Sequence, residues 1–446
     1  TPAFFGEPRL RRATRAMSIH VVFSAECNPA MTWQSVGLFH SHKHVRQPGP
    51  ITRLLACSEE QLASYPGLDA GPTFVHHNMR FGSPAGRDLI DETGYPSYNK
   101  PASVMFFLEE NDVKEEFIAL LDADMQLRTP IDPIALGAKR GVVVSAEYSY
   151  LVGSDQPNAT HTHAFARRFL DEAELPLLVR CGGFHIFHRE DIRKIAPLWI
   201  EYTRRVRAFA AAYPETYYSE SFLNWHQTNG VSADDIATRR KQGLWQAEMY
   251  GYLFGAARVG VSHIVRRDTM LYPGYMPTSG TLPAILHYGS DYTLDASPLP
   301  PPPSDSAITA DASSSSSPPP SMPALPPKPP DVYFNKMSYV NLDLYAQVAG
   351  GVCQRNAQPF FFSTPPPPFY EDGMPRSRRD VLCIEHLQLL NAGLCEFYKQ
   401  RCGGEPITCP VDHPGIDRAL LQCRDEHDNC GGFVAGGECG RNPLWM

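Results

Sequence analysis

The sequence has no run of about 18 apolar residues, no lysine- and arginine-rich run that stands out, and no C-x2-C pair. The first absence excludes a membrane-spanning helix within these residues. The lack of a basic run goes with an overall negative charge, since 40 basic and 48 acidic residues give a net charge of -8. Because non-specific nucleic-acid binding relies on clustered cations, we exclude nucleic acid as a partner. The third absence favours disulfides over a zinc site for the cysteines.

The 11 cysteines are unevenly placed, since three lie before residue 296 and eight after residue 350. Such density in a short segment is typical of a disulfide framework and therefore of an oxidising compartment. Cys383, Cys395, Cys402 and Cys409 allow three pairings among themselves, and the sequence does not choose among them. The sequon Asn158-Ala159-Thr160 also fits a secreted chain. We therefore expect the lumen of the endoplasmic reticulum or the Golgi. Because the sequence begins at Thr1 rather than with methionine, a membrane anchor outside these residues stays compatible with it.

Proline and serine dominate residues 296–331, a composition that predicts an extended, solvated linker. This linker divides the chain into an N-terminal domain, residues 1–295, and a Cys-rich C-terminal region, residues 332–446. Residues 423–446 resemble the start of a ShK-toxin-like module, although they hold only part of that module's cysteines.

The N-terminal domain alternates short apolar runs with helical patterns. Residues 19–24, 51–56, 117–121 and 142–146 are suited to buried strands, and residues 33–42 and 191–207 to helices. Residues 182–185 are expected in a loop before the second of these helices. Strand–helix alternation predicts an α/β domain with a mostly parallel sheet, whose ligands bind beyond the carboxyl ends of the strands.

The strongest chemical signal is Asp122-Ala123-Asp124, directly after the apolar run 117–121. Two carboxylates in a turn suit a hard cation such as Mn²⁺ or Mg²⁺, which would neutralise a diphosphate leaving group. Far downstream, His287 follows two apolar residues and precedes Tyr288 and Gly289, so its imidazole is a candidate third ligand. The alternative for the two aspartates is a solvated acidic loop, and the alternative for His287 is an ordinary surface or core histidine.

The aspartate pair and the late histidine together resemble retaining GT-A glycosyltransferases, which have a Rossmann-like fold. Residues 48–55, 99–101, 121–125, 245–254 and 272–275 narrow the resemblance to the peptidyl serine α-galactosyltransferases of plants and green algae. The related hydroxyproline O-arabinosyltransferases share the general layout. The similarity extends from about His20 to Tyr288.

The resemblance implies transfer of galactose from UDP-galactose to serine hydroxyls of hydroxyproline-rich, extensin-like polypeptides, with retention of configuration and a divalent metal. It implies a metal site at Asp122, Asp124 and His287. It also implies a donor site that shares residues with the metal site and extends to the end of the first strand. The donor-site residues are Ser24, Glu26, Arg53, Lys100, Asp122, Ala123 and His287.

Two further residues are candidates for catalysis. Lys100 is a candidate phosphate contact, because an ammonium stabilises charge on a departing diphosphate; the alternative is a solvated surface charge. Glu248 stands among apolar and aromatic residues that would desolvate its carboxylate. Such a carboxylate is either paired structurally or used on the acceptor hydroxyl.

Three functions remain open at this point. The first is the serine galactosyltransferase. The second is a hydroxyproline O-arabinosyltransferase or a transferase of another UDP-sugar, because the pocket around the sugar sets its identity. The third is an inactive carbohydrate-binding, wall-interaction protein that uses its Cys-rich end.

Overall fold

The computed structural model describes residues 19–148, 151, 165–217, 245–277, 281–294, 332–354, 357–403 and 407–422. The linker at 296–331, the ShK-like segment at 423–446 and the Asn158 sequon lie outside the described residues. The chain forms two compact units. The first comprises Thr1–Cys27, His42–Ala123 and Thr129–Arg267, and the second comprises Asn28–Ser41, Asp124–Arg128 and Asp268–Met446.

The first unit contains a seven-stranded sheet in the order β3-β2-β1-β4-β7-β6-β8. The strands β3, β2, β1 and β4 run parallel to one another, β7 is antiparallel to both of its neighbours, and β6 is parallel to β8. The bounds are Ile19–Glu26 for β1, Ile51–Cys57 for β2, Thr73–His77 for β3, Phe117–Asp122 for β4, Val142–Glu147 for β6, Cys181–His188 for β7 and Ser262–Arg266 for β8. The predicted α/β fold with a mostly parallel sheet is confirmed.

The predicted loop at residues 182–185 is wrong, because these residues lie within β7. Two glycines and two histidines in Cys181–His188 disguise a strand that is buried along nearly its whole length. Gly182 pairs with Ala146 of β6, where the register of the pairing shifts, and the His185 ring shares a 2.7 Å hydrogen bond with Ser145 Oγ. A strand buried on both faces does not need the apolar alternation that would reveal it in the sequence.

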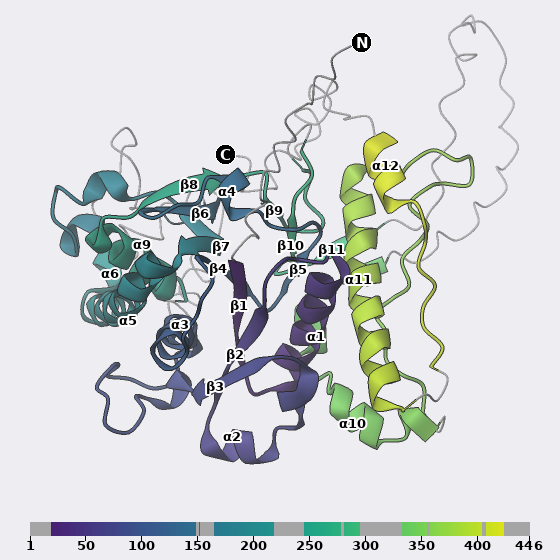
Figure 1. The fold of residues 1–446 in the computed structure, drawn as a ribbon, viewed down its shortest axis with the longest axis horizontal. Coiled ribbons are helices and arrows are strands. Elements are labelled where there is room, and N and C mark those ends of the chain that lie inside the picture. The colour runs from purple at the N-terminus through teal and green to yellow at the C-terminus, as the bar shows by residue number, and fades with distance from the viewer. Residues whose placement is uncertain are drawn as a thin grey trace, which may run out of the picture. The chain divides into compact units, whose positions relative to one another are not determined.

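Helices of the first unit follow the strands. They are α2 (Glu59–Ser64), α3 (Asn99–Glu110), α4 (Pro133–Leu136), α5 (Arg189–Ala212), α6 (Pro214–Tyr217) and α9 (Ala247–Val259). Helices α5 and α9 lie side by side (Figure 1), because Gly251 and Gly255 of α9 carry no side chain where α5 approaches. The close approach fixes the start of α9, where Glu248 stands.

In its described part, the second unit has two small sheets. Strand β10 (Ile285–His287) pairs antiparallel with β5 (Met125–Leu127) and parallel with β9 (Met270–Leu271). Strands β11 (Tyr292–Leu294) and β12 (Val332–Phe334) pair antiparallel, so the two ends of the Pro/Ser-rich segment are neighbours in this unit. The predicted boundaries at residues 295 and 332 stay a prediction.

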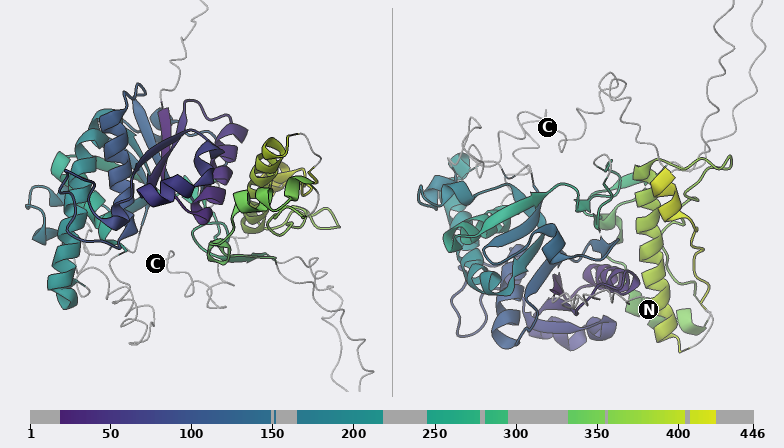
Figure 2. Two further views of the ribbon diagram at one scale, coloured as in Figure 1. Left: turned by 90° about the horizontal axis from the view of Figure 1, so that it is seen from below. Right: turned by 45° about the horizontal axis from the view of Figure 1, so that its top comes forward.

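Among the residues that the structure describes, four helices accompany these sheets: α1 (Pro29–His44), most of which belongs to this unit, α10 (Leu344–Ala349), α11 (Arg378–Arg401) and α12 (Ile416–Gln422). Helix α12 lies against α11, as both views of Figure 2 show. Buried Val381, Leu382, Ala419 and Leu420 of these helices form a core with Leu286 of β10. None of the described helices is long and apolar enough to cross a membrane.

Disulfides join Cys27 to Cys57 in the first unit, and Cys353 to Cys402 and Cys395 to Cys409 in the second. The predicted disulfides of the C-terminal region are therefore confirmed. Of the four cysteines between 383 and 409, Cys395 and Cys409 pair with each other, Cys402 pairs with Cys353, and Cys383 is a buried thiol.

The packing of α9 on α5 is tested by adding one methyl group. A Cβ at Gly251 would lie 2.6 Å from the Thr203 backbone nitrogen, whereas one at Gly255 would lie 3.0 Å from the Trp199 nitrogen. We expect Gly251→Ala to lower the free energy of unfolding by about 2 kcal/mol through overpacking. Gly255→Ala is the matched control, in which a gain in helix propensity of up to about 1 kcal/mol offsets a milder contact. Equal stability of the two variants in urea unfolding would contradict this packing.

Candidate active site

The acidic turn stands where a buried strand ends. Strand β4 is buried up to Leu121, its last residue is Asp122, and the next strand begins at Met125. The turn Asp122-Ala123-Asp124 therefore follows the carboxyl end of a central strand, the position at which α/β sheets bind ligands. The Asp122 side chain is 29% exposed and that of Asp124 is 9% exposed.

In the first unit, Asp122 pairs with Lys100. The Lys100 Nζ lies 2.6 Å from Asp122 Oδ1, and the lysine side chain is 16% exposed. Lys100 is the second residue of α3, and its neighbour Asn99 donates a 2.9 Å hydrogen bond to Glu26 Oε1 at the end of β1. Arg80 also pairs with Glu26 at 3.0 Å. The start of α3 is thus held at the ends of the strands, and Lys100 is not a solvated surface charge.

Glu248 is a buried carboxyl with unusual electrostatics. Its backbone N–H donates to Tyr95 Oη at 3.1 Å, and its carbonyl accepts from Trp199 Nε1 at 2.8 Å. Burial raises the pKa of the Glu248 carboxyl to about 7, with Lys100 opposing and Asp122 reinforcing the increase. The two aromatic contacts fix the backbone of a residue whose carboxyl titrates near neutral pH.

In the second unit, Asp124 is held by His287 and Lys336. His287 Nε2 lies 3.2 Å from Asp124 Oδ1, and the Lys336 ammonium pairs with Asp124 Oδ2. The Tyr288 N–H donates to the Asp124 carbonyl at 3.0 Å, which extends the pairing of β10 with β5. Burial alone would raise the pKa of the Asp124 carboxyl, but His287 and Lys336 outweigh it and the pKa is lowered. Asp124 is therefore an anion throughout the physiological range.

These residues fit a divalent cation. Asp122, Asp124 and His287 each offer one ligand atom, and the three atoms lie within 4.8 Å of one another. Two carboxylates and an imidazole suit Mn²⁺ or Mg²⁺, and leave coordination positions open. The His287 Nδ1 is buried and, among the described residues, has no hydrogen-bond partner. The Tyr272 ring stacks on the imidazole with centroids 4.6 Å apart and fixes its plane.

The other predicted donor-site residues have varied surroundings. Ser24 Oγ, on β1, is 2.9 Å from Ser103 Oγ, which in turn lies 2.7 Å from His76 Nε2. Arg53 is fully buried, and its guanidinium donates to the Gly67 carbonyl at 2.6 Å and to Thr73 Oγ1. These bonds give Arg53 a structural role in joining β2 to the segment before β3. Glu26 is bonded as described above, and Ala123 is buried in the acidic turn.

Sequence reasoning missed Lys336 and Tyr272 at this site. Lys336 follows Asp124 by more than two hundred residues, and its ion pair is a tertiary contact that no local pattern marks. Tyr272 belongs to one of the runs that carried the family resemblance, but nothing in the sequence pairs its ring with His287.

Comparison with known proteins confirms the resemblance. Residues 19–216 match the Hydroxyproline O-arabinosyltransferase family N-terminal domain. The chain is 36% identical to a peptidyl serine alpha-galactosyltransferase of Arabidopsis thaliana, over 62% of this chain and 30% of that protein. It is 26% identical to a protein of the same name from Chlamydomonas reinhardtii, over 96% of this chain and 54% of that protein.

The chain spans about half the length, or less, of these two relatives. Among solved structures, the bifunctional glycosyltransferase WbbM aligns with a TM-score of 0.35 and 9% identity, over 62% of this chain and 46% of that chain.

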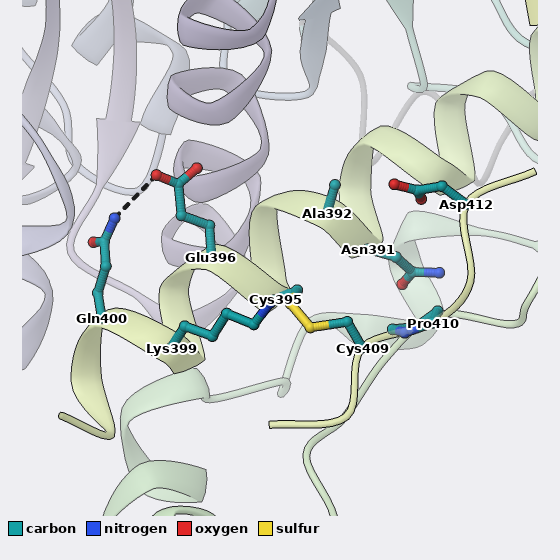
Figure 3. A pocket seen from close by; sticks show the side chains of 9 residues that line it. All are labelled: Asn391, Ala392, Cys395, Glu396, Lys399, Gln400, Cys409, Pro410 and Asp412. Atoms are coloured by element: carbon teal, nitrogen blue, oxygen red, sulfur yellow. Dashed lines mark hydrogen bonds between the residues drawn. A yellow bond between two sulfur atoms is a disulfide. The ribbon is translucent and has the colours of Figure 1, made fainter. Parts of the chain in front are cut away.

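A surface pocket lies elsewhere in the second unit, on α11. Figure 3 shows its lining, in which Lys399 and Glu396 project from the helix beside the Cys395–Cys409 disulfide. Gln400 donates to Glu396 at 3.1 Å, so part of the polar lining is already bonded within the helix. None of the residues that line it belongs to the predicted site.

The buried Glu248 carboxyl makes a pH-dependent contribution to stability. Its folded pKa lies above the unfolded value of 4.5, so its contribution is fully present below pH 4.5 and is lost as pH rises through about 7. We expect the free energy of unfolding of the metal-free protein, relative to Glu248→Gln, to fall by about 3 kcal/mol between about pH 4 and pH 8.

The matched control is Glu110→Gln, at the exposed end of α3, for which the difference from wild type should stay flat. Urea unfolding in the presence of a chelator measures both series. A Glu248→Gln difference that does not change with pH would refute the raised pKa.

Proposed function

We propose that this chain transfers galactose from UDP-galactose to serine hydroxyls of hydroxyproline-rich polypeptides, with retention of configuration at the sugar. The observation that carries the proposal is the acidic turn after β4, with His287 beside Asp124. The similarity to proteins named peptidyl serine alpha-galactosyltransferase supports galactose as the sugar and serine as the acceptor.

Asp122, Asp124 and His287 would hold the divalent ion, for which we propose Mn²⁺. When bound, such an ion supplies a Lewis acid for the diphosphate oxygens. Lys100 would add a fixed positive charge beside Asp122, where it stabilises negative charge on the departing UDP. Ser24, at the end of β1, and the acidic turn would form the wall of the donor site.

Glu248 would act on the acceptor. A carboxyl with a pKa of about 7 can accept a hydrogen bond from a serine hydroxyl when ionised and can hold its proton as the sugar is transferred. The Tyr95 and Trp199 contacts hold the backbone from which this carboxyl extends. Retention is expected to occur without a covalent intermediate on the protein, and we assign no protein nucleophile.

The compartment that we propose is the lumen of the secretory pathway. Three disulfides among the described residues support an oxidising environment, in which such bonds persist.

A specific observation favours a second function. The family match over residues 19–216 is to the hydroxyproline O-arabinosyltransferases, so a pentose donor and a hydroxyproline acceptor are the alternative. The two activities would use the same carboxylates and differ in the pocket around the sugar.

The decisive experiment offers the purified protein Mn²⁺, a panel of UDP-sugars and two peptides, Ser-(Hyp)4 and an all-hydroxyproline peptide. We expect a hexose on the serine peptide from UDP-galactose alone, with an α-linkage by NMR. Asp124→Asn should reduce transfer at least about a hundredfold, because charge stabilisation of the leaving group is lost. Asp112→Asn, which removes the same charge from an exposed site, should leave transfer unchanged.

A pentose on the all-hydroxyproline peptide would establish the alternative instead. Folded protein that transfers no sugar to either peptide would contradict both and leave the carbohydrate-binding function.

A further inference from the structure

Lys336 reaches the acidic turn from beyond the Pro/Ser-rich segment. It follows residues 296–331 in the chain and lies outside the family match at 19–216. Its ammonium pairs with Asp124 Oδ2, while His287 holds the other oxygen of the same carboxylate. Asp124 and Lys336 belong to the same compact unit.

The position of Lys336 is fixed by buried aromatic packing. Phe334, two residues earlier on β12, is 1% exposed and packs on Tyr292 and His386, with ring centroids 5.5 and 4.8 Å away. Asn335 caps the short helix that begins at Lys336 by accepting from the Met337 N–H at 2.8 Å. The backbone that carries Lys336 is therefore anchored close to Asp124. The ion pair does not depend only on the reach of a flexible side chain.

An ion pair at this place competes with a metal. The Asp124 side chain is 9% exposed and that of Lys336 is 27% exposed, so solvent screens their attraction only in part. A divalent cation on Asp124 would meet the Lys336 ammonium as a like charge within the same small volume. Binding of the cation must therefore move the ammonium away from the carboxylate.

The formal charges suggest where the ammonium goes. The two aspartates carry two negative charges, and Lys100 and Lys336 carry two positive charges, so the turn and its lysines are neutral without a metal. A divalent cation alone would leave an excess of two positive charges. A nucleotide-sugar brings a doubly negative diphosphate, which restores neutrality only when metal and nucleotide are both present.

We propose that Lys336 is a built-in counter-cation of the acidic turn, which gives up Asp124 to the divalent ion and then pairs with the donor diphosphate. The second half of this inference rests on the proposed function. The exchange makes the metal bind weakly by itself and tightly together with the nucleotide. The segment after residue 331 thereby becomes part of donor binding, although the family match ends at residue 216.

Calorimetric titration with Mn²⁺, in the absence and presence of UDP, tests the proposal without any sugar transfer. Lys336→Met should bind Mn²⁺ alone about threefold to tenfold more tightly than wild type, because the competing charge is gone. The gain in Mn²⁺ affinity that UDP provides should shrink by a similar factor. Lys336→Arg should behave like wild type.

Lys399→Met, which removes an equal charge from an exposed position on α11, is the matched control and should change neither affinity. Unfolding curves confirm that the variants fold. Unchanged or weaker Mn²⁺ binding by folded Lys336→Met, or no Mn²⁺ binding by either protein, would overturn the proposal. Tighter Mn²⁺ binding in a protein that transfers no galactose would refute the proposed function and keep the counter-cation.

Discussion

Asp122 and Asp124 place two carboxylates close together at the end of a buried strand. Their mutual repulsion must be offset by positive charge beside them. This constraint organises the site. In the first unit, α3 begins at the strand ends and supplies Lys100 to Asp122. In the second unit, Lys336, two residues after the end of β12, pairs with Asp124, and β10 adds the His287 imidazole beside the same carboxylate. Both lysines extend from backbone that is itself anchored, so the two carboxylates have fixed counter-charges before any ion binds.

Burial and neighbouring charge also compete at Glu248, but here burial prevails and the pKa of the carboxyl is raised. Its carboxyl is buried at the start of α9, where Lys100 attracts the charged form and Asp122 repels it. Desolvation dominates, and the carboxyl keeps a proton at a pH at which exposed glutamates do not. The glycines of α9 allow the helix to lie close enough to α5 for this burial. Helix packing thereby sets the protonation of a candidate catalytic group.

Much of this arrangement is predictable from the sequence, because local pattern determines it. The runs that became β1, β2, β4 and β6 are β-rich and apolar, and Asp122 and Asp124 directly follow one of them. Strand β7 escaped prediction because its glycines and histidines hide a buried strand. Lys336 escaped because its ion pair joins residues far apart in the chain. Arg53 is a residue that the sequence did point to as a donor contact. In the structure its guanidinium is fully buried and bonded to Gly67 and Thr73.

The central claim is that one divalent ion binds the acidic turn with His287 as its nitrogen ligand. Electron spin echo spectroscopy of Mn²⁺ bound to the protein with UDP tests it most directly, because coupling to an imidazole nitrogen identifies a histidine ligand. The account predicts a single imidazole coupling that disappears in His287→Gln, whereas His413→Gln, with its ring bonded to the Pro365 carbonyl, retains it. An imidazole coupling that persists in His287→Gln, or bound Mn²⁺ with none in wild type, would contradict the account.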